Sequence, residues 1–395
     1  VTLASVTSGV QPDTPGLTVD NLGAMVGRQT PLLALFVPLL LVYVVDGRRG
    51  LRQTWLPAVV CGFAFAIGQF VCANYISVPL ADIVASLAGA AAVVLLLRFW
   101  QPSESPQLAR PAGRGPDPDV DGSGGGVSAG ASRGVGTLTS RPATDSRAEI
   151  AKAYAPYAVI VAIFSVSNLP AVKAALAMEP WTLKFAWPGL DVLTTAGGPQ
   201  ASATFSFGWL PAAGTLMILA GLITMALLKV GPGRALKIYG QTYYELRYAI
   251  VTVMAVLALA YVMNQSGQTG TLGNFLAQTG GFFAVLSPIL GWIGVAVTGS
   301  DTSANALFGA LQVQTAASAG LDPVLLAAAN TSGGVLGKMI SPQNLAIAAS
   351  AVGMAGQEGV IFRKVIGYSL VMLVFMCALV ALQATPVLDW MIPTP

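Results

Sequence analysis

Long apolar stretches separated by short polar segments dominate the chain and predict helices that cross a membrane. About 20 apolar residues are needed to span the hydrocarbon layer of a bilayer. Eight stretches approach this length, and they cover residues 30–45, 55–76, 78–97, 153–168, 208–228, 246–263, 282–297 and 365–383. The pattern therefore predicts an all-α polytopic membrane protein with about eight transmembrane helices.

The basic residues between these stretches set the expected orientation. Arg48, Arg49 and Arg52 lie together in the stretch DGRRGLRQ. Short loops rich in Lys and Arg stay on the cytoplasmic side of the membrane. If this stretch is cytoplasmic, the other strongly basic stretches, at 229–237 and 363–364, fall on the same side. We therefore expect a multi-pass membrane protein with these basic stretches on its cytoplasmic side.

Two segments interrupt the regular alternation in the first half of the chain. Residues 101–148 are rich in Pro, Gly, Ser, Asp and Arg, and cannot bury enough apolar surface to fold. We expect residues 101–150 to be a disordered cytoplasmic linker between a first part, 1–100, with three spans, and a second part, 151–395. Residues 170–207 carry several aromatic residues among Gly and Pro, which predicts an external segment anchored at the membrane interface.

Composition supports the membrane assignment and excludes several classes of function. The chain is 54% hydrophobic and 9% charged, whereas soluble domains have about 25% charged residues. Its net charge of +3 is too small to indicate a nucleic-acid partner. It contains no histidine, the commonest metal ligand and proton shuttle, and its three cysteines lie in apolar stretches. We expect no metal and no cofactor, and we expect carboxylates to carry any proton chemistry.

The alternation breaks down between residues 298 and 343. The stretch TGSDTSAN at 298–305 is almost entirely polar or glycine, and 330–343 contains Gly333, Gly334 and Gly337, which are expected to give the chain freedom to turn. The apolar pieces between them are too short to span a bilayer comfortably and indicate partial or re-entrant arms. Interrupted helices at membrane depth are typical of a transporter's binding site, and irregular backbone is tolerated there only beside protein or water. We expect residues 298–343 to form the substrate region.

Each of the two expected breaks contains one conspicuous charge, Asp301 in the first and Lys338 in the second. A charged side chain at the bilayer centre costs roughly 2.5–3.5 kcal/mol, so such residues usually face a protein interior or a watery cavity. Burial favours the protonated form of a carboxyl group and a nearby cation favours the ionised form, so Asp301 is suited to exchange a proton. Lys338 is suited to bind a substrate carboxylate or to pair with Asp301. A purely structural ion pair, or a lysine that reaches the interface, is the alternative.

Small polar residues surround these two charges. Asp82 is the only other acid expected to lie deep, and less convincingly, whereas Asp322 is expected in a turn. The side chains that are suited to hydrogen-bond a small anion are those of Ser300, Thr302, Ser303, Asn305, Asn330, Thr331, Ser332, Ser341 and Gln343. The same residue types also let transmembrane helices approach and bond to one another, so we expect about half of them to touch substrate.

Two blocks in this region resemble a known family. GSDTSANALFGALQ and AANTSGGVLGKMISPQNLAIA are similar to the signature blocks of the L-lactate permease family, bacterial proton-coupled carriers of lactate and related 2-hydroxy acids such as glycolate. GAMVGRQTP, DGRRGLRQTW and SPILGWIGVAVTGSD support the resemblance, which covers nearly the whole chain except 101–148. Family members have further N-terminal spans with a glycine-rich acidic block that nothing here matches. The resemblance thus implies that the N-terminal part is lacking and that a complete site would use both halves.

We therefore expect a secondary transporter, not an enzyme, that carries L-lactate and related 2-hydroxy monocarboxylates with a proton. The resemblance implies that it is a multi-pass protein of the bacterial plasma membrane. Asp301 would couple the proton, and Lys338 with the flanking polar residues would bind the anion. A sodium-coupled carrier of organic anions is the alternative, because amide, hydroxyl and backbone oxygens also suit Na⁺. A channel and an intramembrane enzyme are further alternatives, although the enzyme lacks a nucleophile–base pair. The oligomeric state is left open.

Overall fold

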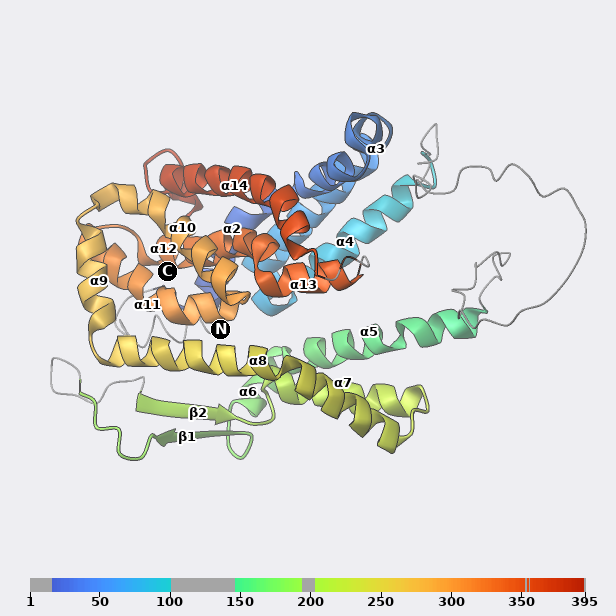
Figure 1. Ribbon diagram of the computed structural model, residues 1–395, viewed down its shortest axis with the longest axis horizontal. Helices are drawn as coiled ribbons and strands as arrows, with labels where there is room; N and C mark the ends of the chain where they lie inside the picture. Colours follow the sequence, from blue (N-terminus) through green and yellow to red (C-terminus); the bar gives the residue numbers. More distant parts are fainter. Residues whose placement is uncertain (1–15, 101–145, 194–202, 352–353, 355, 394–395) are drawn as a thin grey trace, which may run out of the picture.

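The computed structural model describes residues 16–100, 146–193, 203–351, 354 and 356–393 of the chain. Over these residues the chain is almost entirely helical, with one short β-hairpin (Figure 1). Five helical runs are long and apolar enough to cross a membrane, and a sixth arises if the bent pair Ile250–Gln265 and Gln268–Ala277 is one span. The expected all-α polytopic membrane fold is confirmed. These described spans are fewer than eight because Val19–Ile76 is one nearly continuous run, Ala213–Leu227 is too short to count as a span, and Ile250–Gln265 counts only as part of the bent pair.

The first part of the chain begins with a helix that the hydropathy pattern placed too late. Its elements are α2 (Val19–Ala34), α3 (Val37–Val71), the π-helical turn η1 (Cys72–Ile76), the 3-10 turn η2 (Val78–Leu80) and α4 (Ala81–Leu96). The hydroxyl of Thr18 accepts a hydrogen bond from the backbone N–H of Asn21 at 3.2 Å, which caps α2 well before the expected start at residue 30. Met25 and Gln29, expected to precede the membrane, are completely buried.

Two breaks shape this part. The basic stretch expected to be a loop lies inside α3, which bends where Gly47 adopts φ 59° and Thr54 leaves the helical region. Glycine carries no Cβ and takes a positive φ at no steric cost. The second break is Ser77, which is extended (φ −168°, ψ 121°) between η1 and η2. It sets the position at which α4 begins.

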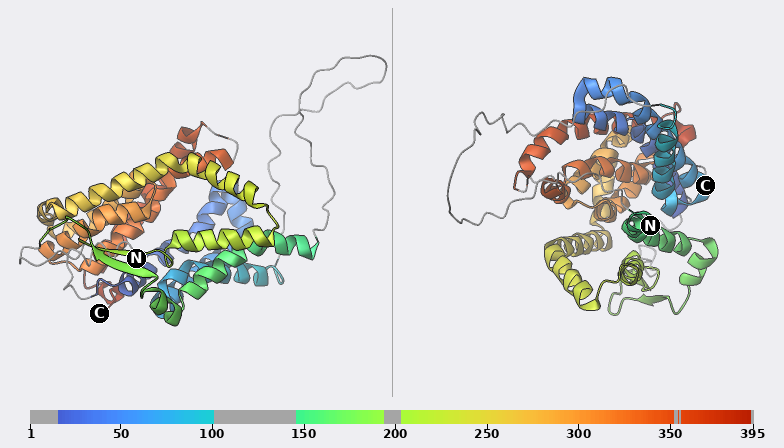
Figure 2. Two further views of the ribbon diagram at one scale, coloured as in Figure 1. Left: turned by 90° about the horizontal axis from the view of Figure 1, so that it is seen from below. Right: turned by 90° about the vertical axis from the view of Figure 1, so that its right-hand side faces the viewer.

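A second layer of helices lies beside the core. It contains α5 (Arg147–Ser167), α6 (Pro170–Leu176), β1 (Thr182–Ala186), β2 (Thr204–Gly208), α7 (Ala213–Leu227) and the long α8 (Pro232–Gln265) (Figure 2). Residues 101–145 of the expected linker, 101–150, lie outside the described residues. Its last residues are helical instead, because Ser146 and Glu149 form a capping box at the start of α5. The expected external segment is a short helix and a hairpin with exposed aromatic side chains.

The core is built around α12. Its elements are α9 (Gln268–Ala277), η4 (Gly280–Phe282), α10 (Phe283–Thr298), α11 (Asp301–Ala319), α12 (Pro323–Gly337), η5 (Lys338–Ile340), α13 (Pro342–Ala351), α14 (Glu358–Gln383) and η6 (Asp389–Met391). The helices α2, α10, α11 and α14 all pack against α12. Residues 324–330 of α12 are almost completely buried. A helix enclosed on every side is apolar and small-residue-rich because no face meets solvent.

The breaks in the 298–343 region are shorter than expected. The first is confined to Gly299, with φ 72°, and Ser300, whose hydroxyl accepts from the N–H of Ser303 at 3.3 Å and caps α11. The second lies at residues 338–341, because α12 stays helical through Gly337. The expected arms are therefore regular helices of 19 and 15 residues.

The glycines of α12 permit close helix packing instead of a turn. A Cβ at Gly333 would collide with the carbonyl oxygen of Pro288 on α10, and one at Gly337 would collide with that of Trp292. Small residues let transmembrane backbones approach in this way. The expectation that these glycines let the chain turn is wrong.

Candidate substrate-binding site

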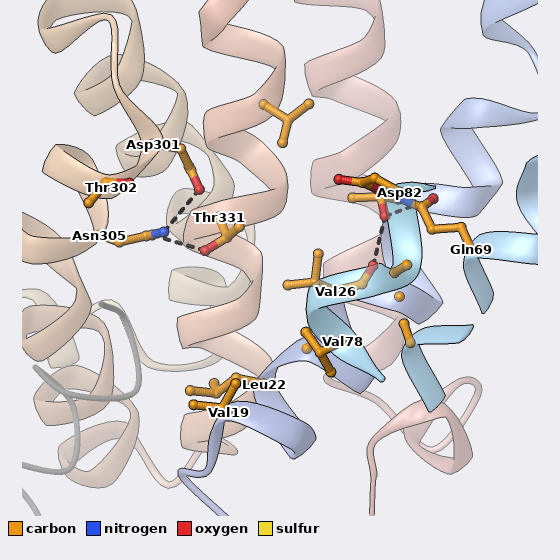
Figure 3. A pocket seen from close by; sticks show the side chains of 16 residues that line it. Val19, Leu22, Val26, Gln69, Val78, Asp82, Asp301, Thr302, Asn305 and Thr331 are labelled. Atoms are coloured by element: carbon orange, nitrogen blue, oxygen red, sulfur yellow. Dashed lines mark hydrogen bonds between the residues drawn. The ribbon is translucent and has the colours of Figure 1, made fainter. Parts of the chain in front are cut away.

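A cavity of about 590 Å³ lies between α2, α3 and α4 on one side and α11 and α12 on the other (Figure 3). This volume is within the range of small-molecule sites. Its polar lining consists of Thr30, Gln69, Asp82, Asp301, Thr302, Asn305 and Thr331. Its apolar lining includes Val19, Leu22, Val26 and Val78. The described part of the lining contains no Lys or Arg. The cavity can therefore hold a small molecule with one polar and one apolar side.

Asp301 is the first residue of α11 and reaches the cavity from the break that precedes it. Its Oδ2 accepts a hydrogen bond from the side-chain amide of Asn305 at 3.0 Å. Its Oδ1 lies against Gly334 of α12, where a side chain would displace it. This oxygen is buried and has no hydrogen-bond partner among the described residues. Because a buried polar atom without a partner costs free energy, Asp301 is suited to gain a proton or a ligand.

Asn305 connects Asp301 to α12. Its Oδ1 accepts hydrogen bonds from the amide of Asn330 at 2.8 Å and from the hydroxyl of Thr331 at 2.9 Å. The Oδ1 of Asn330 accepts in turn from Gln312 at 3.2 Å. Asn305, Asn330 and Gln312 are all buried. A buried polar network of this kind fixes the helices that it joins in one arrangement. The position of the Asp301 carboxyl group therefore depends on the contact between α11 and α12.

The opposite wall comes from the first part of the chain. Asp82 stands in the first turn of α4, just after the break at Ser77, and its Oδ1 accepts from the amide of Gln69 on α3 at 3.1 Å. The hydroxyl of Thr30 on α2 lies 3.4 Å from the Oε1 of Gln69, and its single proton also bonds the carbonyl of Val26 at 2.9 Å. Figure 3 shows Asp82 and Gln69 across the cavity from Asp301 and Asn305. Residues 16–100 thus supply the second wall of this cavity.

Sequence reasoning missed Gln69 and Thr30 and gave Asp82 little weight. One signal was available, since Gln69 is a polar residue within the apolar stretch 55–76. Polar side chains in transmembrane helices usually face the protein interior or a cavity. Hydropathy alone gives no indication of which other helix they face.

The structure brings four of the predicted site residues to the cavity and places the others elsewhere. Asp301, Thr302, Asn305 and Thr331 line it. Asn330 lies behind Asn305, and Ser300 and Ser303 form the cap of α11, where the hydroxyl of Ser303 is buried without a partner among the described residues. Ser332 is turned toward Gln29, Ser341 donates to the carbonyl of Lys338, and Gln343 is exposed beside Gly299.

Lys338 lies outside the cavity. It follows the end of α12, its side chain is exposed, and its carbonyl accepts from Ser341 and from the amide of Asn344 at 3.0 Å. Because α12 continues to Gly337, Lys338 follows the helix end and is not part of the cavity lining. It is near enough to interact electrostatically with Asp301, although no ion pair joins the two within the described residues.

Ser332 belongs to a buried chain of hydrogen bonds that joins three helices. Its hydroxyl donates to Gln29 Oε1 at 2.6 Å, and Gln29 Nε2 donates to Gln383 Oε1 on α14 at 2.9 Å. All three side chains are completely buried. Ser332 was predicted to bind substrate, but its hydroxyl instead helps to join α12 to α2 and α14 through these hydrogen bonds.

Ser332→Ala should lower thermal stability and leave lactate affinity unchanged. The substitution removes the donor to Gln29 Oε1, and a buried acceptor without a partner costs about 1–3 kcal/mol. The melting temperature in detergent and the concentration of lactate that half-saturates binding measure the two effects. A weaker affinity at unchanged melting temperature would place Ser332 in the substrate site.

A second cavity of about 330 Å³ adjoins the first. It lies among α2, α3, α12 and α14, and its lining is mostly apolar, including Leu33 and Phe65. The two cavities share Thr30, Gln69 and Val335. These three residues therefore form the partition between a polar and an apolar space.

Comparison with known proteins identifies the family of this chain. The model of the L-lactate permease family matches residues 3–387. The L-lactate permease of Escherichia coli K12 is 38% identical over 388 residues, which are 96% of this chain and 67% of that protein. The L-lactate permease of Bacillus subtilis 168 is 37% identical over 397 residues, with the same two coverages. The glycolate permease GlcA of Escherichia coli K12 is 36% identical over 385 residues, 93% of this chain and 66% of that protein.

The chain spans about two thirds of the length of these relatives. No solved structure matches it. Permeases are transporters and not enzymes, so the expectation of a non-enzymatic, multi-pass protein of the bacterial plasma membrane is confirmed. The family match over nearly the whole sequence, together with the apolar helices around the cavity, establishes that the chain belongs to the L-lactate permease family.

Proposed function

We propose that this protein carries L-lactate and related 2-hydroxy monocarboxylates across the plasma membrane together with a proton, and that the 590 Å³ cavity binds the substrate. One observation carries the proposal. Carboxyl groups line the cavity from both walls, whereas the described lining contains no basic side chain. A substrate anion therefore needs a cation brought with it.

A proton on Asp301 meets this requirement. Ionised Asp301 would repel the carboxylate of the substrate, whereas protonated Asp301 offers one O–H donor to it. Because Oδ1 is buried against Gly334 and has no partner among the described residues, it is the oxygen suited to hold the proton, which removes the negative charge that would repel the substrate. Binding of the anion and binding of the proton then favour each other, which is the thermodynamic basis of symport.

The remaining lining suits a small 2-hydroxy acid. Thr302, Asn305 and Thr331 offer polar atoms beside Asp301, and Val19, Leu22 and Val26 offer an apolar surface to a short alkyl group. The names of the relatives, lactate and glycolate permeases, agree with a substrate of this size. Lys338 is not part of this proposal because it does not line the cavity.

Asp301→Asn should abolish lactate accumulation driven by a pH gradient. Asparagine has nearly the same shape but cannot exchange a proton, so the coupled step is lost while lactate exchange at equal pH persists. Uptake of labelled lactate by liposomes that contain the full chain measures both reactions. Asp46→Asn, which changes an exposed acid outside the cavity, is the matched control.

Two outcomes would contradict the proposal. Undiminished pH-driven accumulation in Asp301→Asn would remove the proton role of this residue. Accumulation that follows a sodium gradient at fixed pH, and not a proton gradient at fixed sodium, would favour the sodium-coupled alternative.

A further inference from the structure

We propose that Asp82 accepts a hydrogen bond from the 2-hydroxyl of the substrate and so selects 2-hydroxy acids over other short monocarboxylates. This inference rests on the proposed function, because it assigns an individual role to the second wall of the same cavity.

The fold presents Asp82 to the cavity on the side opposite Asp301. The extended residue Ser77 ends the π-helical turn, and α4 then starts with Asp82 in its first turn. Asp82 lines the cavity and its side chain is exposed to it. Figure 3 shows the side chain of Asp82 on one wall and those of Asp301 and its partner Asn305 on the other. A substrate between the walls therefore meets a carboxyl group at each end.

The hydrogen bonds of the two carboxyl groups suit them to different tasks. Asp82 Oδ1 accepts from Gln69, and Oδ2 has no hydrogen bond among the described residues. An ionised carboxyl group is an acceptor only. Asp301, buried with one oxygen unpartnered, is suited to carry the proton.

Only one group of a 2-hydroxy monocarboxylate ion can donate a hydrogen bond to a protein acceptor. The substrate carboxylate accepts hydrogen bonds, and the hydroxyl is its single O–H donor. If the substrate carboxylate pairs with protonated Asp301 and the substrate hydroxyl with Asp82, both aspartates have a hydrogen-bond partner. The reverse orientation would bring the substrate carboxylate against ionised Asp82, so the two walls also fix the direction in which the substrate lies.

Substrates without the hydroxyl offer no hydrogen-bond donor to Asp82. Propionate offers only C–H groups to Asp82, and pyruvate offers a carbonyl oxygen, which places two acceptors face to face. A site built to hydrogen-bond a substrate hydroxyl discriminates strongly against analogues that lack it, because its own polar group is left unpaired. We expect the protein to prefer lactate and glycolate over propionate and pyruvate by roughly 10- to 100-fold.

Asp82→Asn tests this role. Displacement of labelled L-lactate from the purified full chain by lactate, glycolate, propionate and pyruvate gives four affinities for each variant. The asparagine amide donates to a carbonyl oxygen, so pyruvate should gain affinity, lactate should lose it, and the preference should narrow by about tenfold or more. Asp82→Glu keeps an acceptor and should retain the order of preference, and Asp46→Asn should change nothing.

The outcomes separate this inference from the proposed function. If Asp82→Asn keeps the full preference for 2-hydroxy acids, or loses affinity for all four acids equally, Asp82 is not the selecting group, while lactate transport by the unchanged protein still supports the function. If the unchanged protein binds no lactate, the proposed function itself fails. A variant that does not fold is replaced by Gln69→Leu, which removes the donor that orients Asp82 and should narrow the same preference.

Discussion

Gly333→Leu should prevent the core from assembling. Gly333 faces the carbonyl oxygen of Pro288 where α12 crosses α10, and even a methyl group there would collide with backbone atoms. A change of side-chain rotamer cannot relieve a collision between a Cβ and a carbonyl, so the helices must separate. Overpacking of a core costs about 1–3 kcal/mol and occasionally more, and here the displaced elements also hold the Asp301 wall. We expect loss of most of the folded protein.

The measurement is the yield of monodisperse protein in detergent together with its melting temperature. Gly333→Ala should lie between the unchanged protein and Gly333→Leu, because it adds only the Cβ. Gly221→Leu on α7 is the matched control, since a Cβ at Gly221 meets no other atom within 4 Å. A normal melting temperature for Gly333→Leu would mean that α10 and α12 are not packed through their backbones.

The membrane class and many of the helices were predictable because they depend on local composition. A run of apolar residues must be helical in lipid, wherever it packs. The glycines of the 330–343 region were interpreted as turn residues because a glycine permits both a turn and a close approach, and sequence alone does not distinguish these uses. A Cβ at Gly337 would collide with the Trp292 carbonyl, so this glycine serves the close approach of the α12 and α10 backbones.

For a related reason, the sequence predicted one wall of the cavity and not the other. Asp301, Asn305 and Thr331 were found because a polar cluster within one short region is visible in the sequence. The wall that contains Gln69 and Asp82 was not, because more than 200 residues separate it from Asp301 and only tertiary packing joins the two.

Asn305→Leu should eliminate lactate binding and destabilise the protein together. Leucine fills a similar volume but removes the acceptor for Asn330 and Thr331 and the donor to Asp301. Each buried polar group left without a partner costs about 1–3 kcal/mol, and a partly satisfied network loses more than its separate bonds suggest. We expect a loss of about 3 kcal/mol or more in stability, and a wall that no longer holds the carboxyl group of Asp301.

Two further variants distinguish the structural and the binding contributions of Asn305. Asn274→Leu is the control, because Asn274 is exposed and accepts a single hydrogen bond, from Ser318 at 2.8 Å. Asn305→Asp keeps the acceptor for Asn330 and Thr331 but replaces the donor to Asp301 with a second carboxyl group. It should therefore retain most of the melting temperature. Two carboxyl groups then take the place of the carboxyl–amide pair that is joined at 3.0 Å, so they must share a proton, and lactate should bind only in acidic solution. Normal lactate affinity at neutral pH in Asn305→Asp would show that the donated hydrogen bond to Asp301 is not needed for binding.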